Sequence, residues 1–155
     1  MLFSEKLCLL RMNRGVIQKL FGLSAGCSDK TFGEVQIDES YKDINFLFFR
    51  YVLNNKPVFR MECQIIGNKI HINHIKPFSE NKRNKYFNKG YGSKLMNALL
   101  DYCEEKGIFE IYGELSIVDL DYKDRIHHFY QKFGFNITTF PELNGCYYGS
   151  ISKKL

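Results

Sequence analysis

The sequence predicts an α/β fold of the α+β type, with a mixed, mostly antiparallel sheet of about six to seven strands and helices on both faces. Two observations predict this fold. Three apolar runs follow one another with only dipeptide turns between them, and two segments of helical periodicity come later, separated by another strand-like run. Because a strand–helix–strand step joins parallel strands, we expect a parallel pair inside the sheet.

The three consecutive runs predict an antiparallel meander. They are INFLFFRYVL from residue 44, KPVFRMECQII from residue 56 and KIHINHI from residue 69. Aromatic and β-branched residues favour strands, and the dipeptides Asn-Asn and Gly-Asn between the runs favour tight turns. The first 43 residues carry weaker signals. In that segment RGVIQKLF is compatible with a short helix, and GLSAGCSDKTFG has the composition of a loop.

The first long helix is predicted in GSKLMNALLDYCEEKG, residues 92–107. Its apolar residues recur on one helical face: Leu95, Met96, Leu99, Leu100 and Cys103. The acidic residues of the segment lie on the opposite face. Gly107 is a typical residue at the end of a helix, so we expect the helix to stop there.

A strand and a second helix follow. IFEIYGELSIV, residues 108–118, reads as the strand, and DYKDRIHHFYQKFG, residues 121–134, reads as the helix, with Asp121 as its cap and Gly134 as its stop. Helical spacing places four residues on the apolar face of this helix: Ile126, Phe129, Tyr130 and Phe133. FNITTF and CYYGSISKKL then predict a closing hairpin.

Size and composition predict one globular domain over residues 1–155, with 45% hydrophobic and 25% charged residues. No apolar run reaches the ~18–20 residues of a membrane span, so we expect a cytoplasmic protein. The five cysteines form no CxxC pair, which predicts neither a disulfide framework nor a zinc site, and no metal is expected. The net charge of +5 suits an anionic ligand.

A glycine pair marks the entrance of the first helix. The segment KPFSENKRNKYFNKGYGSKL, residues 76–95, combines Gly90 and Gly92 with several lysines. A helix N-terminus offers unpaired N–H groups and a partial positive charge, and glycine lets the backbone approach a phosphate closely. Leu95 excludes the GxGxxG dinucleotide fingerprint, and the upstream glycine of a Walker A loop is absent. The segment therefore predicts an anion site, with a plain tight turn as the alternative.

Three short motifs occur in a fixed order: HIKPF, NKGYGSKL and FYQKFGF. In this order, with a strand between the last two, they resemble the GNAT superfamily of acyl-CoA-dependent N-acetyltransferases over about residues 44–155. The resemblance implies the three-layer GNAT fold, acetyl-CoA as acetyl donor and an amine as acceptor. It also implies a strand that splays from its parallel neighbour and pairs with the pantetheine arm.

The resemblance implies a set of cofactor-binding residues. Ile75 and Lys76 fall on the splayed strand, and the pyrophosphate turn covers Phe87, Asn88, Lys89, Gly90, Tyr91 and Gly92, with Ser93 next to it. Lys132 is expected either to reach the phosphates or to be an exposed, solubilising lysine. Lys89 and Lys94 flank the glycines and add positive charge. The chain departs from the family pattern at Phe87, where Arg or Gln is usual, and at Lys123, where Asn is usual.

Three residues are predicted to move protons. Tyr130 matches the tyrosine general acid of the family, and a phenol with a pKa of about 10 can protonate a thiolate. His71 on the strand before the basic loop is one candidate base, and Glu114 on the later strand is its rival. Strand periodicity places His74 on the other face from His71 unless a bulge intervenes. His127 and His128 are interpreted as surface or packing residues, because their spacing matches no metal site.

Two further readings stay open from the sequence. A degenerate GNAT domain would bind CoA in a regulatory or interaction role, which the departures at Phe87 and Lys123 favour. A nucleic-acid module would use the basic loop and its tyrosines, but the basic residues form no broad stripe, so nucleic acid is not the expected partner. The edge of the closing hairpin could also pair in a homodimer.

Overall fold

The computed structural model describes residues 33–79 and 88–155. Within these ranges the chain forms a seven-stranded sheet in the order β1-β2-β3-β4-β5-β7-β6. The strands are β1 (Gly33–Asp38), β2 (Phe46–Leu53), β3 (Lys56–Ile66), β4 (Lys69–Pro77), β5 (Glu110–Ser116), β6 (Asn136–Asn144) and β7 (Tyr147–Lys154). Two α-helices, α3 (Tyr91–Lys106) and α4 (Lys123–Lys132), and two 3-10 segments, η1 (Lys42–Ile44) and η3 (Ile117–Tyr122), complete the described elements.

The sheet has the predicted mixed topology. β4 and β5 are parallel, and the other neighbouring strands in the described sheet are antiparallel. The predicted meander is confirmed as β2, β3 and β4, joined by short turns. The closing hairpin is confirmed as β6 and β7. β1, at the edge beside β2, was not predicted, because its sequence GEVQID alternates too weakly to stand out from the loop before it.

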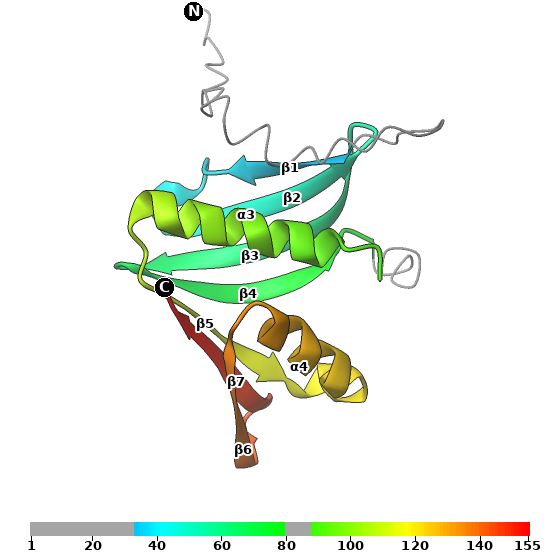
Figure 1. Ribbon diagram of the computed structural model, residues 1–155, viewed down its shortest axis with the longest axis vertical. Helices are drawn as coiled ribbons and strands as arrows, with labels where there is room; N and C mark the ends of the chain where they lie inside the picture. Colours follow the sequence, from blue (N-terminus) through cyan, green and yellow to red (C-terminus); the bar gives the residue numbers. More distant parts are fainter. Residues whose placement is uncertain (1–32, 80–87) are drawn as a thin grey trace, which may run out of the picture. The chain divides into compact units, whose positions relative to one another are not determined.

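Both described helices lie on the same side of the sheet, α3 over β2 and β3 and α4 beside β6 (Figure 1). The predicted helical layer on the second face is not found in residues 33–79 and 88–155. The short helix predicted in RGVIQKLF lies outside the described residues. None of the described helices is long and apolar enough to cross a membrane.

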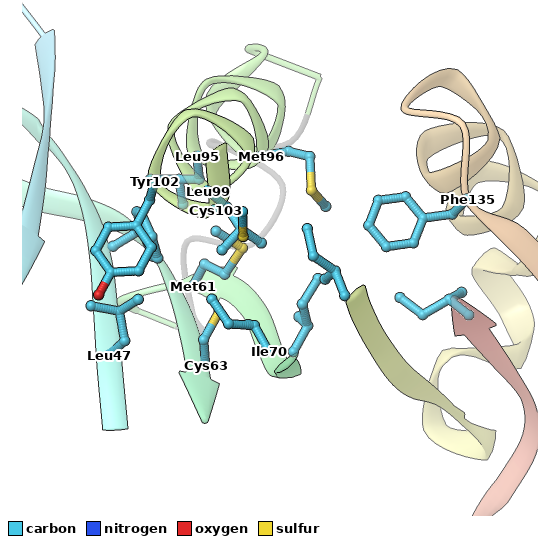
Figure 2. Close-up of a cluster of buried hydrophobic side chains, with 14 of the residues drawn as sticks. Leu47, Met61, Cys63, Ile70, Leu95, Met96, Leu99, Tyr102, Cys103 and Phe135 are labelled. Atoms are coloured by element: carbon cyan, nitrogen blue, oxygen red, sulfur yellow. The ribbon is translucent and has the colours of Figure 1, made fainter. Parts of the chain in front are cut away.

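The core lies between α3 and the sheet (Figure 2). The buried face of α3 is the one that the sequence predicted, and it packs on β2 and β3. The residues with 0% exposure there include Leu47, Phe49, Met61, Cys63, Ile70, Leu95, Met96, Leu99 and Cys103. Burial raises the pKa of the Cys63 thiol, and it raises the pKa of Cys103 to about 12. These two cysteines are therefore neutral core residues, not nucleophiles.

The predicted helix ends at the two glycines are confirmed. The predicted cap at Asp121 is wrong. Gly107 ends α3 in the left-handed conformation, and its N–H donates to the Cys103 carbonyl. Gly134, also left-handed, follows the end of α4. Asp121 does not cap α4, because it lies inside η3. Ser116 caps that 3-10 segment instead, by accepting from the N–H of Val118, and α4 begins only at Lys123.

Candidate active site

The parallel seam between β4 and β5 opens after three residue pairs. Lys69 pairs with Glu110, Ile70 with Ile111, and His71 with Tyr112. Beyond these pairs β4 continues to Pro77 and β5 to Ser116 without a shared ladder. The backbone of β4 after His71 therefore has no β-strand partner on its β5 side among the described residues. Such an edge can pair with an extended ligand.

A bulge in β4 lies at the point where the seam opens. His74 faces Glu62 and Ile72 faces Cys63, which leaves Asn73 as the extra residue. A bulge bends its strand and increases the local twist, so it turns β4 away from β5. On β5, a Cβ at Gly113 would lie 2.9 Å from the Ile72 carbonyl oxygen. Glycine at this position allows the last close approach of the two strands before they part.

The bulge also changes which face His74 occupies. It places His71 opposite Gln64 and His74 opposite Glu62, on the face that points away from the core. Strict alternation would place the two histidines on opposite faces of the sheet. The bulge, which the sequence analysis allows as an exception, places them on the same face. Ile75 consequently turns toward the helices and packs against the core.

The entrance of α3 has the features of an anion site. Gly90 precedes the helix with a φ of 76°, which a residue with a side chain rarely adopts, and no side chain caps the first turn. Asn88 is also left-handed, with a φ of 59°. The first turn of α3 contains no acidic residue. The N–H groups and the partial positive charge of such a helix entrance favour a negative ligand.

The α3 entrance packs directly against both β4 and α4. A Cβ at Gly92 would lie 3.4 Å from the ring of Phe129 and 3.9 Å from a methyl of Ile75. From the last turn of α4, Lys132 donates through its ammonium to the Ser93 hydroxyl at 3.3 Å. Predicted cofactor-binding residues from three separate motifs therefore meet at one place.

Other predicted cofactor residues lie around this place. Lys89 is exposed beside the glycines, whereas Lys76 points to the face away from the helices, so only its backbone borders the seam. The Lys94 ammonium projects from the first turn of α3 and has a side-chain partner on β2. It donates to the Tyr51 hydroxyl at 2.9 Å, and Tyr51 stacks on Tyr91 at 4.6 Å. Phe87 lies outside the described residues.

Tyr130 lies on α4 beside the open seam, partly buried and packed edge-on against Phe129 and Phe135. Burial raises the pKa of Tyr130, with smaller contributions from Cys63 and Asp119. The group is therefore a neutral phenol at physiological pH, which can donate a proton or a hydrogen bond.

His71 and Glu114, predicted as rival bases, form one pair across the seam. The Nε2 atom of His71 contacts the Glu114 carboxylate, and its Nδ1 atom lies 2.5 Å from the Asn73 side-chain oxygen. The His71 side chain is 18% exposed and that of Glu114 is 38% exposed, so the carboxylate is the member open to solvent. Of the two, Glu114 borders an open groove of about 440 Å³ on the face away from the helices, whose lining includes Tyr112 and Glu110.

The motifs and the fold agree with known acetyltransferases. The family described as "Acetyltransferase (GNAT) family" matches residues 83–135, which contain the α3 entrance and all of α4. No curated protein matches the chain.

Solved structures share this fold. The PaiA N-acetyltransferase of Thermoplasma acidophilum, in complex with coenzyme A, has a TM-score of 0.58 and 20% identity over 76% of this chain and 65% of its own. A GNAT-family acetyltransferase of Staphylococcus aureus has a TM-score of 0.55 and 18% identity over 75% of each chain. The ribosomal-protein-S18-alanine N-acetyltransferase of Escherichia coli has a TM-score of 0.53 and 19% identity over 76% of each chain.

The chain has the fold of these GNAT structures, and its residues 83–135 match the GNAT family. The predicted resemblance to the GNAT superfamily is confirmed, and so is the predicted fold class. The PaiA match spans 65% of that protein, and identities of this size show the fold alone.

One polar cluster of this GNAT fold was missed from the sequence. His127 on α4 stacks on Tyr148 of β7, with ring centroids 6.0 Å apart, and Lys123 holds its ammonium 5.8 Å from the Tyr148 ring centroid. His127 was interpreted as a surface or packing residue. Its position one helical turn before Tyr130 was the available signal, because residues three apart share a helix face. Nothing local in the sequence links it to Tyr148.

The environment of His127 predicts a pH-dependent stability. Burial, and then the nearby Lys123 charge, hold the pKa of His127 below its ordinary value of 6.5. At a pH between the lowered pKa of the folded protein and 6.5, the unfolded chain binds a proton that the folded protein does not. The free energy of unfolding should therefore rise with pH and level off above about pH 6.5. His127→Gln should make this rise shallower in denaturant titrations from about pH 5 to pH 7.

His128→Gln is the matched control, because His128 is an exposed neighbour on the same helix. It should keep the slope of the parent protein. If His127→Gln leaves the slope unchanged, His127 is not held neutral by the fold.

Proposed function

We propose that the chain is an N-acetyltransferase that moves the acetyl group of acetyl-CoA directly to a primary amine, with both substrates bound together. The observation that carries the proposal is the opening of the β4–β5 seam beside the uncapped entrance of α3. An extended ligand can pair with the free edge of β4, and a diphosphate suits the helix entrance. Coenzyme A has these two parts in one molecule.

The residues at the seam fit a diphosphate-bearing thioester. Gly90, Tyr91 and Gly92 would present backbone N–H groups to the diphosphate, and Ser93 and Lys132 would add a hydroxyl and an ammonium. The backbone of β4 at Ile75 and Lys76 would pair with the amide-bearing arm and polarise the thioester carbonyl. Acetyl-CoA supplies the activated acetyl group when it is bound. The PaiA structure, which contains coenzyme A, supports this choice of donor.

The reaction needs one proton removed and one supplied. As the amine nitrogen bonds to the acetyl carbon and the carbon–sulfur bond breaks, the amine loses a proton and the sulfur gains one. The Glu114–His71 pair would take the amine proton, because its carboxylate faces the open groove. Tyr130 would give its phenolic proton to the sulfur. Because an alkyl ammonium has a pKa of about 10.4, the pair also has to bind the amine in its neutral form.

The activity is tested with purified protein, acetyl-CoA and a panel of amines. The panel holds an alanine-initiated peptide, a lysine-containing peptide, spermidine, an aminoglycoside and glycine. Loss of thioester absorbance is the readout, since the exposed Cys146 would react with thiol reagents. We expect acetyl-CoA to raise the Tm and one class of amine to accelerate thioester loss.

A specific observation favours the second candidate, a GNAT domain that binds CoA without catalysis. Lys123, at the family's Asn position, is directed toward Tyr148. That candidate predicts a raised Tm without thioester loss for any amine. If acetyl-CoA does not raise the Tm and no amine causes thioester loss, both assignments are excluded.

Lys132→Ala should weaken acetyl-CoA binding about fivefold, equivalent to about 1 kcal/mol for one charge-assisted contact on a partly exposed side chain. The reason is that its ammonium lies at the α3 entrance, 3.3 Å from the Ser93 hydroxyl. Isothermal titration gives the Kd. Lys106→Ala, at the opposite end of the same helix, is the matched control and should bind as the parent does. Equal affinities for both variants would place the diphosphate elsewhere.

Tyr130→Phe should lower kcat about a hundredfold while KM for acetyl-CoA changes less than about twofold. The substitution removes the phenolic proton and keeps the ring that packs against Phe129 and Phe135. Steady-state kinetics on the best amine of the panel measures both constants. Tyr147→Phe, at an exposed tyrosine of β7, should be neutral. An unchanged kcat in Tyr130→Phe would exclude the residue from the chemistry.

A cytoplasmic location, a single domain over residues 1–155 and a homodimer that pairs through the edge of the closing hairpin stay predictions.

A further inference from the structure

A stacked pair of rings between α4 and β7 contains two buried polar atoms. His127 and Tyr148 stack with an interplanar angle of 20°, and Tyr148 is only 5% exposed. The Nε2 atom of His127 and the hydroxyl of Tyr148 are both buried, and neither has a hydrogen-bond partner among the described residues. Buried polar groups in proteins almost always have a partner, which is often an ordered water.

Burial is the largest cause that keeps both side chains neutral; of the nearby charges, Lys123 and Asp119 act in the same direction and Asp124 opposes it. Lys123 and Asp124 face His127 from α4 itself, and Asp119 acts on Tyr148 from η3. Burial lowers the pKa of His127 and raises the pKa of Tyr148. A neutral imidazole can pass a proton between its two nitrogens, and a neutral phenol can both donate and accept.

The pair adjoins Tyr130, the proposed proton donor. Tyr130 lies one helical turn after His127 on α4, so the two side chains share a helix face. Tyr148 and Asp119 both contribute to raising the pKa of Tyr130, which places the two phenols in one electrostatic environment. His127 is partly exposed at one end of this helix face, and Tyr130 packs against the core at the other.

We propose that His127 and Tyr148 bind an ordered water and form a proton relay that restores the proton of Tyr130 after each acetyl transfer. The inference rests on the proposed function. The relay answers a requirement of that function. After the transfer, the bound coenzyme would cover the side of the phenol that gave its proton to the sulfur. A route along α4 from His127 would reprotonate Tyr130 without waiting for that product to leave.

The relay balances in protons. When the Tyr130 O–H bond breaks and the sulfur–hydrogen bond forms, Tyr130 is left as a phenolate. The bound water gives one proton to the phenolate and receives one from the Nε2–H of His127 as a solvent proton binds at Nδ1, so the imidazole stays neutral throughout. Exchange with solvent then restores the first tautomer. Tyr148 holds the water through its hydroxyl, and one proton moves from solvent to Tyr130 overall.

The test compares the first turnover with later turnovers. Tyr148→Phe keeps the ring that stacks on His127 and removes only the hydroxyl, while His127→Gln keeps a polar side chain that cannot relay a proton. Stopped-flow thioester absorbance follows each variant at high protein concentration, with acetyl-CoA and the amine of the panel that reacts fastest. The matched controls are Tyr147→Phe and His128→Gln, exposed neighbours of the two residues.

In both variants we expect a burst of about one thioester per protein molecule at the parent rate, followed by a steady rate about tenfold lower. The first turnover uses the proton already on Tyr130, and each later one waits for its replacement. The parent and both controls should show no burst. If one variant fails to fold, the other decides the outcome.

Other outcomes overturn the relay. Equal slowing of the first and later turnovers would give the pair a purely structural role, and unchanged rates in both variants would give it no role. Both results leave the acetyltransferase assignment intact. A parent protein that consumes no thioester with any amine would overturn the assignment, and the relay with it.

Discussion

The interruption of one β-ladder is the constraint on which the rest of the structure depends. A sheet gains by pairing each strand fully, and an unpaired inner edge exposes backbone groups that need partners. Here β4 and β5 part after the pairing of His71 with Tyr112. A bulge at Asn73 redirects β4, and Gly113 removes the side chain that would collide with the carbonyl of Ile72. The fold therefore keeps one edge available for an extended ligand instead of for its neighbour.

The packing around the opening keeps it open. α3 packs on β2 and β3, while α4 packs on β6, so each helix belongs to a different side of the seam. The helices meet at Gly92, where the ring of Phe129 and the methyl of Ile75 both approach. A side chain larger than a methyl group at Gly92 would collide with these groups and change their spacing. The same contact sets the distance between the α3 entrance and Tyr130, so packing and chemistry share one position.

The sequence predicted the parts of the fold that local periodicity governs. The apolar runs predicted β2, β3 and β4, and the helical spacing predicted the buried face of α3, because each pattern needs only neighbours along the chain. The candidate site residues come from motifs at element ends, as at Gly90, Gly92 and Tyr130, and their roles stay predictions. β1 was missed, since its alternation is weak. The sequence does not predict the bulge at Asn73, because a bulge depends on the register between two strands and has no local sequence pattern.

The contacts between distant elements were the least predictable part of the site. His71 and Glu114 were rivals in the sequence, and they became partners only because β4 and β5 lie side by side. His127 and Tyr148 meet because β7 packs under α4, which no spacing encodes.

These two pairs lie on opposite faces of the sheet, and the proposed chemistry gives that separation a reason. The amine would lose its proton to Glu114 on the open face, while the sulfur would gain one from Tyr130 on the helix face. Since each face exchanges protons with solvent independently, neither step waits for the other, and no proton has to cross the occupied seam.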